Sequence, residues 1–277
     1  MTPDDYCQQK AAASGSSFYY SFLFLPRERR RAITALYAFC REVDDVVDET
    51  SDAQVAAAKL AWWRVEVGNL FAGKPQHPVT KALSVFKDQF SISQERLNEI
   101  IDGMEMDLTQ SRYLDWPGLE KYCYRVAGVV GLLAAGIFGY RNTSTLSYAR
   151  ELGIAFQLTN IVRDVGEDAR KNRIYLPMED MKRFNVTAAD ILNAKETPAF
   201  VELMKFEAQR AKDCYARAFA ALPAEDRKAQ RAGLIMAAIY RALLDEIERD
   251  DFHVLTRRTS LTPLRKLWIA WKTWIGA

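Results

Sequence analysis

Apolar residues recur along most of this chain at the spacing of about 3.6 residues that is typical of one face of an α-helix. Almost no stretch alternates between apolar and polar residues, as a half-buried strand would. Prolines stand where these periodic segments start or stop, as expected of a residue that interrupts helices. The predicted helices lie near residues 27–50, 52–72, 78–90, 93–111, 116–140, 144–169, 198–221, 224–250 and 261–274.

This pattern predicts an all-α protein. No internal repeat, low-complexity stretch or Gly/Ser-rich linker divides the 277 residues, so we expect 1–277 to form a single domain. The longest apolar run, 126–140, covers about 15 residues, and a helix needs about 20 to span a bilayer. We therefore expect it to be a buried helix.

Composition narrows the class of partner. Lys and Arg total 38 and Asp and Glu total 36, which argues against nucleic-acid binding by bulk positive charge and favours a small-molecule partner. The N-terminus lacks the basic start and apolar stretch of a signal peptide, and the four cysteines are widely scattered, so we expect a cytoplasmic protein with reduced thiols. Only two histidines are present, which argues against a histidine-rich zinc site or a Ser-His-Asp triad. Residues 68–75 resemble the start of a phosphate-binding P-loop, but Pro75 replaces the required Ser or Thr.

Two predicted helices each carry one stripe of polar and acidic residues within an otherwise apolar sequence. Residues that are 3, 4, 7 or 11 positions apart share a helix face. The first stripe consists of Tyr37, Arg41, Asp44 and Asp48, and the second of Gln157, Asn160, Asp164 and Asp168. Either stripe alone is also compatible with an ordinary solvated face. Two stripes of like charges among apolar residues favour a bound cation.

The residue types indicate the cation and its ligand. Carboxylate and amide oxygens, completed by water and phosphate, are typical of Mg²⁺. Arginines such as Arg41, Arg163 and Arg173 are suited to gripping diphosphate oxygens. We therefore expect the substrate to be an allylic diphosphate. Its C–O bond breaks, the diphosphate leaves with the bonding electrons, and a carbocation remains. The cavity must keep water away from that carbocation.

The apolar part of that cavity has its own candidates. The segment 127–139 is rich in small residues, which leaves room for an isoprenoid tail, although tight helix packing would need the same composition. Aromatic side chains are suited to stabilising a cationic carbon through their π faces, although single aromatics in a helical core more often serve only packing. The aromatic candidates are Phe18, Tyr37, Tyr122 and Tyr240.

Longer motifs make the chain resemble the squalene/phytoene synthase family of head-to-head prenyl transferases. The resemblance rests mainly on "YAFCREVDDVVD" (37–48) and "QLTNIVRDVGEDARKNRIYLP" (157–177), and it extends to "GMEMDLTQSRY" (103–113), "YCYRVAGVVG" (122–131) and "IYRALLDEI" (239–247). It implies a single-domain isoprenoid synthase fold of the class I terpenoid type, a helical bundle around a central cavity. The phrase "GSSFYYSFLFLP" (15–26) resembles the hopanoid-pathway members that make presqualene diphosphate more than it resembles the carotenoid-pathway members.

The resemblance also implies roles for individual residues. The implied Mg²⁺ ligands, for two or three ions, are Asp44, Asp48, Asn160, Asp164 and Asp168. The implied catalytic groups are the four aspartates with Tyr37 and Tyr240, whose hydroxyls are candidate proton acceptors beside the released pyrophosphate. The implied substrate-binding residues are Ser14, Gly15, Ser16, Ser17, Phe18, Tyr37, Arg41, Tyr122, Gln157, Arg163, Arg173, Tyr175 and Tyr240. Family members often carry lysine at the position of Ser16, so one charged phosphate contact is missing here.

The resemblance implies that two farnesyl diphosphates are joined head to head, with presqualene diphosphate and pyrophosphate as products. Phytoene or dehydrosqualene synthesis is the alternative within the family. Head-to-tail elongation or terpene cyclisation fits "DDVVD" but not the second motif, and a non-catalytic assembly factor is disfavoured because all four aspartates are present. No Gly-rich dinucleotide turn follows a strand, so NADPH is not expected.

The end of the chain suggests contact with a membrane surface. In "LRKLWIAWKTW" (264–274) basic residues alternate with tryptophans, as in helices that lie at a membrane interface. A last helix docked on the domain through its tryptophans is the alternative. We expect a cytoplasmic monomer with peripheral contact on the inner membrane face.

Overall fold

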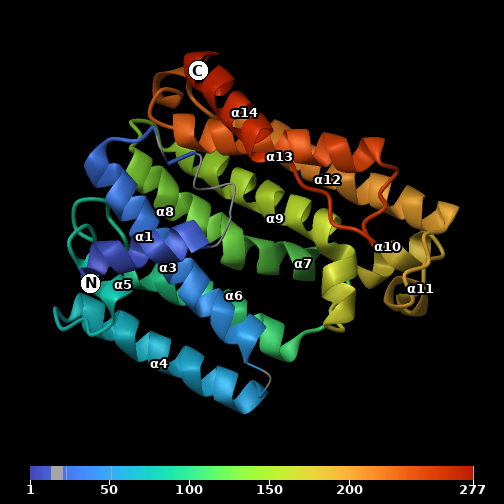
Figure 1. Ribbon diagram of the computed structural model, residues 1–277, viewed down its shortest axis with the longest axis horizontal. Helices are drawn as coiled ribbons and strands as arrows, with labels where there is room; N and C mark the ends of the chain where they lie inside the picture. The colour runs from blue at the N-terminus through green and yellow to red at the C-terminus, as the bar shows by residue number, and fades with distance from the viewer. Residues whose placement is uncertain (14–20, 23, 51, 277) are drawn as a thin grey trace.

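The computed structural model describes residues 1–13, 21–22, 24–50 and 52–276, and these are helical with no strand beyond one isolated bridge between Arg112 and Ile174. This confirms the all-α prediction. The helices are α1 (Pro3–Ala13), α3 (Arg27–Glu49), α4 (Ala53–Phe71), α5 (Pro78–Ser84), α6 (Gln94–Thr109), α7 (Trp116–Cys123), α8 (Val129–Phe138), α9 (Ser144–Arg170), α10 (Met178–Arg183), α11 (Ala188–Leu192), α12 (Pro198–Ala221), α13 (Arg231–Arg249) and α14 (Pro263–Gly276). Figure 1 shows α8 and α9 in the middle of the bundle, with α4 at one edge and α12 to α14 at the other.

Among the helices that the structure describes, three are missing from the sequence prediction. In α1 only Cys7 and Ala11 are buried, so its apolar pattern is weak, and it is held on α3 by ion pairs such as Lys10 with Asp45 at 2.8 Å. Helices α10 and α11 are too short for periodicity to show, although the Thr187 capping box marks the start of α11.

Three predicted helices have different bounds. The segment predicted as 78–90 ends as a helix at Ser84 and continues in turns. The segment predicted as 224–250 begins with the 3₁₀ turn Ala224–Asp226, and α13 starts only at Arg231. The segment predicted as 116–140 contains a π-helical turn, Tyr124–Gly128, between α7 and α8. Such turns are frequent at functional sites, and this one borders the cavity described below.

The continuous helix Trp116–Phe138 corrects an estimate made from the sequence. By length and composition this helix of 23 residues could cross a membrane. The apolar run 126–140, counted from the sequence, is shorter. Only 44% of the helix's most apolar window is buried inside the protein. Much of the remainder faces an internal cavity, since Val126, Val130 and Ala134 line it. We therefore interpret it as a cavity-lining helix of the bundle.

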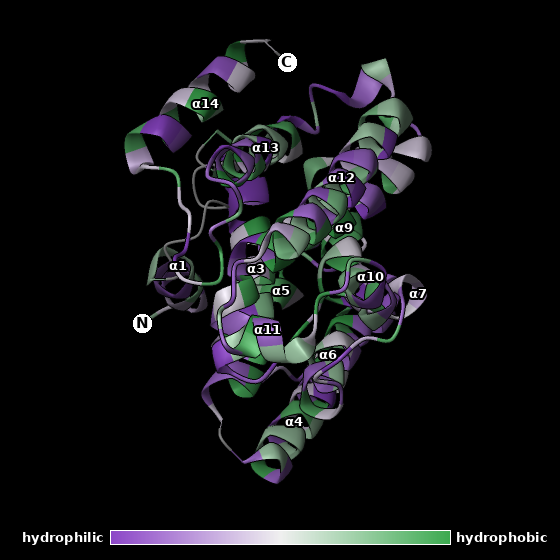
Figure 2. Cartoon of the chain, turned by 90° about the vertical axis from the view of Figure 1, so that its right-hand side faces the viewer, coloured by the Kyte–Doolittle hydropathy of each residue, from purple (hydrophilic) through white to green (hydrophobic). Residues whose placement is uncertain are grey.

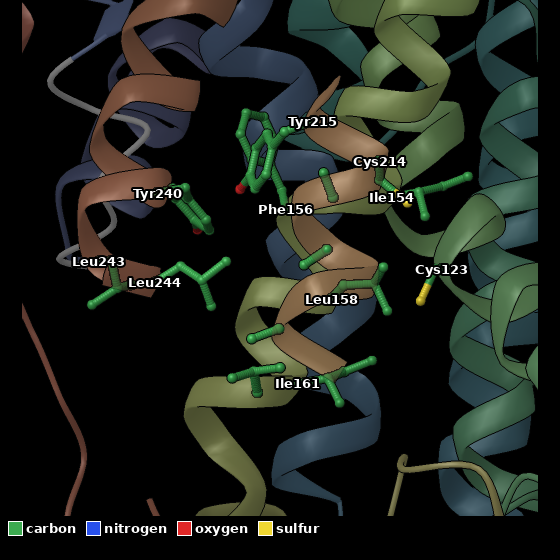
Figure 3. Packing of buried hydrophobic residues seen from close by; sticks show 14 of the residues in the cluster. Cys123, Ile154, Phe156, Leu158, Ile161, Cys214, Tyr215, Tyr240, Leu243 and Leu244 are labelled. Atoms are coloured by element: carbon green, nitrogen blue, oxygen red, sulfur yellow. The ribbon is translucent and has the colours of Figure 1, made fainter. Parts of the chain in front are cut away.

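Two clusters of buried hydrophobic residues form the core. One is centred on α9, α12 and α13, and the other on α3, α4, α5 and α6. Tyr124 and Val126, in the π-helical turn, pack against both clusters. Figure 3 shows part of the first cluster, where Phe156 of α9 lies beside Tyr215 and Tyr240. The space between the two clusters is where the candidate site lies.

Candidate active site

The first acidic stripe lies along the last turns of α3. The repeat of buried residues on α3, including Leu36, Phe39 and Val43, directs the opposite edge of the helix outward from the core, and Tyr37 and Cys40 line the cavity. Arg41 forms ion pairs with Asp44 and Asp45. Carboxylates at the C-terminal end of a helix are opposed by its macrodipole. The carboxylates of the first stripe therefore lie at the end of α3 where the helix dipole disfavours negative charge.

The second stripe lies on the C-terminal half of α9. Gln157 and Asn160 line the cavity, and Asp164 and Asp168 follow at one-turn spacing toward the helix end. Arg163 forms an ion pair with Asp164, and Arg258 Nε lies 2.9 Å from Asp164 Oδ1. Arg258 comes from the loop before α14, and nothing in the sequence pattern indicated this contact.

The two stripes meet through basic residues that follow α9. Arg173 donates a hydrogen bond of 3.0 Å to Asp48 Oδ1, and Lys171 Nζ lies 3.2 Å from Asp48 Oδ2. These contacts join the end of α3 to the end of α9 across 125 residues of sequence. Tyr37 of the first stripe and Gln157 and Asn160 of the second line the same cavity, so the two stripes approach each other beside it.

A fifth aspartate, which the sequence analysis missed, lies between the stripes. Asp107 of α6 accepts a hydrogen bond of 2.8 Å from the Tyr122 hydroxyl on one oxygen and one of 2.8 Å from the Tyr175 hydroxyl on the other. Its charge acts on Asp44 and Asp168, which raises the pKa of both. In the sequence, Asp107 is a single carboxylate among the apolar positions of α6. A single carboxylate does not repeat along a helix face, so the sequence pattern does not indicate a role for it.

Burial and mutual repulsion raise the pKa of three carboxyl groups. Burial is the largest cause in each, and neighbouring carboxylates add to it, so that the pKa of Asp44 rises to about 6, that of Asp107 to about 6 and that of Asp168 to about 7. Asp164 differs, since Arg163 and Arg258 outweigh burial and lower its pKa. Protein groups thus compensate Asp164, whereas Asp44, Asp107 and Asp168 lack sufficient positive charge.

The carboxylates fit Mg²⁺ only if it is shared with a ligand. Within the described residues, no three His, Cys, Asp or Glu side chains converge closely enough to hold a metal by themselves. Mg²⁺ usually takes one or two carboxylates and completes its shell with water and substrate phosphates, so this arrangement suits it. Asn160 Oδ1 is buried and accepts no hydrogen bond within the described part of the chain, which leaves a ligand oxygen available. The residues that would hold Mg²⁺ are Asp44, Asp48, Asn160, Asp164 and Asp168, with Asp107 behind them.

An apolar cavity extends from this acidic end. About 180 Å³ of it is accessible to the centre of a water-sized sphere, and it is partly open to solvent. Tyr37, Gln157 and Asn160 stand at its polar end, and Phe22, Val130, Ala134 and Met236 are among its apolar lining. This shape suits a molecule with an anionic head and a long hydrocarbon tail.

The glycines near the cavity have a packing role as well. A Cβ at Gly131 would lie 2.3 Å from the carbonyl oxygen of Ala149, and one at Gly153 would lie 2.3 Å from that of Ala127. These two positions therefore allow α8 and the preceding π-helical turn to approach α9. For Gly131 the packing alternative is borne out, although the residue also lines the cavity.

The remaining predicted residues divide into three groups. Tyr240 is buried with its ring centroid 4.9 Å from that of Phe156, and burial raises its pKa. Tyr122 and Tyr175 are buried against Asp107 rather than in the cavity lining, and their rings stack at 5.2 Å. Ser14, Gly15, Ser16, Ser17 and Phe18 lie outside the described residues.

The three arginines expected to bind diphosphate are instead paired with carboxylates. Arg41, Arg163 and Arg173 contact Asp44, Asp164 and Asp48, respectively. Diphosphate binding would require these pairs to open or to be bridged by metal. Each arginine lies among the carboxylates of the two stripes.

The raised pKa values predict a pH dependence of stability. Unfolded carboxyl groups lose their protons near pH 4, but Asp44 and Asp168 hold theirs in the folded, metal-free protein until about 6 and 7. Each of these two groups binds more protons in the native state over that interval, so its contribution to the free energy of unfolding falls as the pH rises from about 4 to about 7. Urea unfolding in EDTA measures this contribution as a difference in pH slope, and the slope of Asp168→Asn should be less negative than that of wild type. An unchanged slope in that variant would contradict the assignment.

The sequence matches the squalene/phytoene synthase family model over residues 11–265. The chain belongs to the squalene/phytoene synthase family. It is 38% identical to a phytoene synthase from Arthrospira platensis, covering 94% of this chain and 89% of that protein. It is also 35% identical to the 15-cis-phytoene synthase of Synechocystis sp., covering 98% and 84%.

Solved structures of the squalene/phytoene synthase family share the fold. A dehydrosqualene synthase crystallised with a ligand is 31% identical, with a TM-score of 0.86 over 98% of this chain and 95% of that one. The squalene synthase HpnC from Alicyclobacillus acidocaldarius is 27% identical, with a TM-score of 0.81 over 90% and 94%. These matches confirm the isoprenoid-synthase bundle expected from the sequence. Because both curated relatives described above are named phytoene synthases, the comparisons favour the carotenoid-type alternative over presqualene diphosphate synthesis.

Proposed function

We propose that this chain joins two allylic prenyl diphosphates head to head in a Mg²⁺-dependent reaction. The observation that carries the proposal is the pair of carboxylate stripes from α3 and α9 at the polar end of one apolar cavity. Family membership supports the same class of reaction, that of a prenyltransferase. Bound Mg²⁺ supplies the positive charge that lets a diphosphate leave.

The residues of the chain account for the first step. One substrate loses pyrophosphate as its C1–O bond breaks. Arg41, Arg163 and Arg173, which lie among the carboxylates of the two stripes, would stabilise the leaving oxygens. The C2–C3 double bond of the second substrate then attacks the allylic cation. Loss of one proton gives a cyclopropylcarbinyl diphosphate. The apolar lining excludes water, which would otherwise capture the cation.

For the final product we favour a hydrocarbon of the phytoene or dehydrosqualene type. It forms when the cyclopropyl intermediate loses its own diphosphate, rearranges and releases a second proton, which needs no reductant. The relatives named phytoene synthase and the structurally similar dehydrosqualene synthase support this ending. Release of presqualene diphosphate is the second candidate, supported by the resemblance of residues 15–26 to hopanoid-pathway members.

Product analysis tests both parts of the proposal. Purified protein is incubated with farnesyl or geranylgeranyl diphosphate, with Mg²⁺ or EDTA, and with or without NADPH. We expect Mg²⁺-dependent release of pyrophosphate and a C30 or C40 hydrocarbon without NADPH. A C30 diphosphate as the end product would favour the second candidate. Turnover in excess EDTA, or a product of head-to-tail elongation, would contradict the head-to-head reaction.

A further inference from the structure

Helix α14 presents an apolar stripe to solvent. Leu264, Leu267, Trp268, Trp271 and Ile275 fall at helix spacings of 3, 4, 7 and 11 from the first, so they share one face. All five are exposed, including Trp268 at 58% and Trp271 at 49%, whose rings lie 5.2 Å apart. Large apolar side chains gathered on one exposed face commonly mark an interaction site.

The opposite face of α14 docks on the domain, so the stripe is additional to the contacts that hold the helix. Ala270 is fully buried, Ile269 and Trp274 pack against the core, and the Trp274 ring stacks on Phe24 at 5.1 Å. Arg265 contacts Glu246 of α13 at 2.6 Å. Figures 1 and 2 both show α14 on the outer side of α13, at an edge of the molecule. The expected docking on the domain therefore holds for Trp274, which packs on the core, whereas Trp268 and Trp271 face outward.

A basic residue beside the stripe favours an anionic partner. Residues 252–277 contain five Lys and Arg and no Asp or Glu, but Arg257, Arg258 and Arg265 pair with carboxylates of the domain. Lys272 is exposed beside the stripe. Tryptophans with adjacent basic residues are typical of helices that lie in the headgroup region of an anionic bilayer. A second copy of this chain fits less well, because each partner in a stable interface contributes about 800 Å², and the stripe is one helix wide.

We propose that the apolar stripe of α14 binds the surface of an anionic lipid bilayer, with Trp268 and Trp271 in the headgroup region and Lys272 beside the lipid phosphates. The helix lies flat, because its other face stays on the domain. This arrangement places the bilayer on the α13 side of the cavity, since α14 packs on α13, which lines the apolar part of the cavity through Gly233 and Met236. Lys266 of α14 also lies near enough to Arg163 and Arg258 for their charges to act on it.

Vesicle binding of the full chain tests the proposal. Vesicles of phosphatidylcholine, with or without phosphatidylglycerol, are sedimented with wild type, with the double variant Trp268→Ser/Trp271→Ser, and with Lys272→Glu. We expect wild type to bind the anionic vesicles, less so at high salt, and the double variant to bind at least about tenfold more weakly. Lys272→Glu should weaken binding to anionic vesicles only. Trp62→Ser on α4 is the matched control, because Trp62 is 47% exposed on another helix, and it should bind as wild type does.

Two further measurements keep the result independent of folding and of catalysis. Brominated acyl chains should quench wild-type tryptophan fluorescence in intact protein, and circular dichroism checks that the double variant is folded. Wild-type binding by the double variant, or equal loss in the Trp62→Ser control, would overturn the proposal. So would a wild-type dimer that binds no vesicles and becomes monomeric in the double variant, since the stripe would then bind another copy. None of these readouts needs substrate, so a failed activity assay leaves them unaffected.

Discussion

The Asp168→Asn variant is expected to lose about a thousandfold in kcat/KM while its thermal unfolding midpoint stays the same or rises. The loss follows because the amide removes one charge from the site that would hold Mg²⁺ against the departing diphosphate. The fold is spared because burial and the charges of Asp164 and Asp107 already disfavour the Asp168 carboxylate, raising its pKa to about 7. Steady-state kinetics at saturating Mg²⁺ and thermal unfolding without metal measure the two effects.

Two related variants sharpen this prediction. Asp44→Asn should behave like Asp168→Asn, because the pKa of Asp44 is raised for the same reasons. Asp88→Asn is the control, since Asp88 is highly exposed and pairs with its neighbour Lys87. Near-normal turnover in either active-site variant at saturating Mg²⁺ would refute the assignment of the metal site.

Asp164→Asn should differ from both in its effect on the fold. Asp164 is paired with Arg163 and Arg258, and its pKa is lowered. Its replacement leaves the mostly buried Arg163 without full compensation. We therefore expect loss of turnover together with a lower unfolding midpoint.

The second large effect is expected at Asp107. Asp107→Asn should lower kcat about a hundredfold and increase the Mg²⁺ concentration needed for half-maximal rate. An amide at this position offers two tyrosine hydroxyl donors only one acceptor atom, so one hydroxyl must turn away from its present role as a donor. It also removes the negative charge that acts on Asp44 and Asp168.

A control and a mutant cycle separate this role from simple support of the fold. Asp102→Asn changes a carboxylate on the same helix that pairs with Arg64 at 2.6 Å, and it should leave Mg²⁺ dependence unchanged. Tyr122→Phe and Tyr175→Phe should each lose less than Asp107→Asn, and their effects should not add in the double variant. Wild-type Mg²⁺ dependence in Asp107→Asn would leave Asp107 as a structural residue only.

The sequence was sufficient to locate the two stripes because each repeats along its own helix. Asp44 and Asp48, like Asp164 and Asp168, are one turn apart, so periodicity alone predicts their shared face. Helix periodicity does not predict contacts between distant segments. Arg258 pairs with Asp164 across 94 residues, and no local pattern encodes that pairing.

The same limit applies to the short elements. Helices α10 and α11 are held by tertiary contacts and local caps, and five or six residues span too few turns for a periodic signal. The π-helical turn Tyr124–Gly128 is also invisible in the pattern, because its residues continue an apolar run. Product choice depends on how the second diphosphate sits relative to the carboxylates, and side-chain spacing along a helix does not encode that position.

The division of the core into two clusters on either side of the cavity has a consequence for the energetics of the whole domain. A hydrocarbon tail bound between them, as the proposed function requires, would supply apolar contacts that the protein side chains do not make with one another. Ligands that bind only the native state raise its stability in proportion to the logarithm of their concentration over Kd. We therefore expect the free energy of unfolding to be highest with substrate or product bound and to fall when the product leaves.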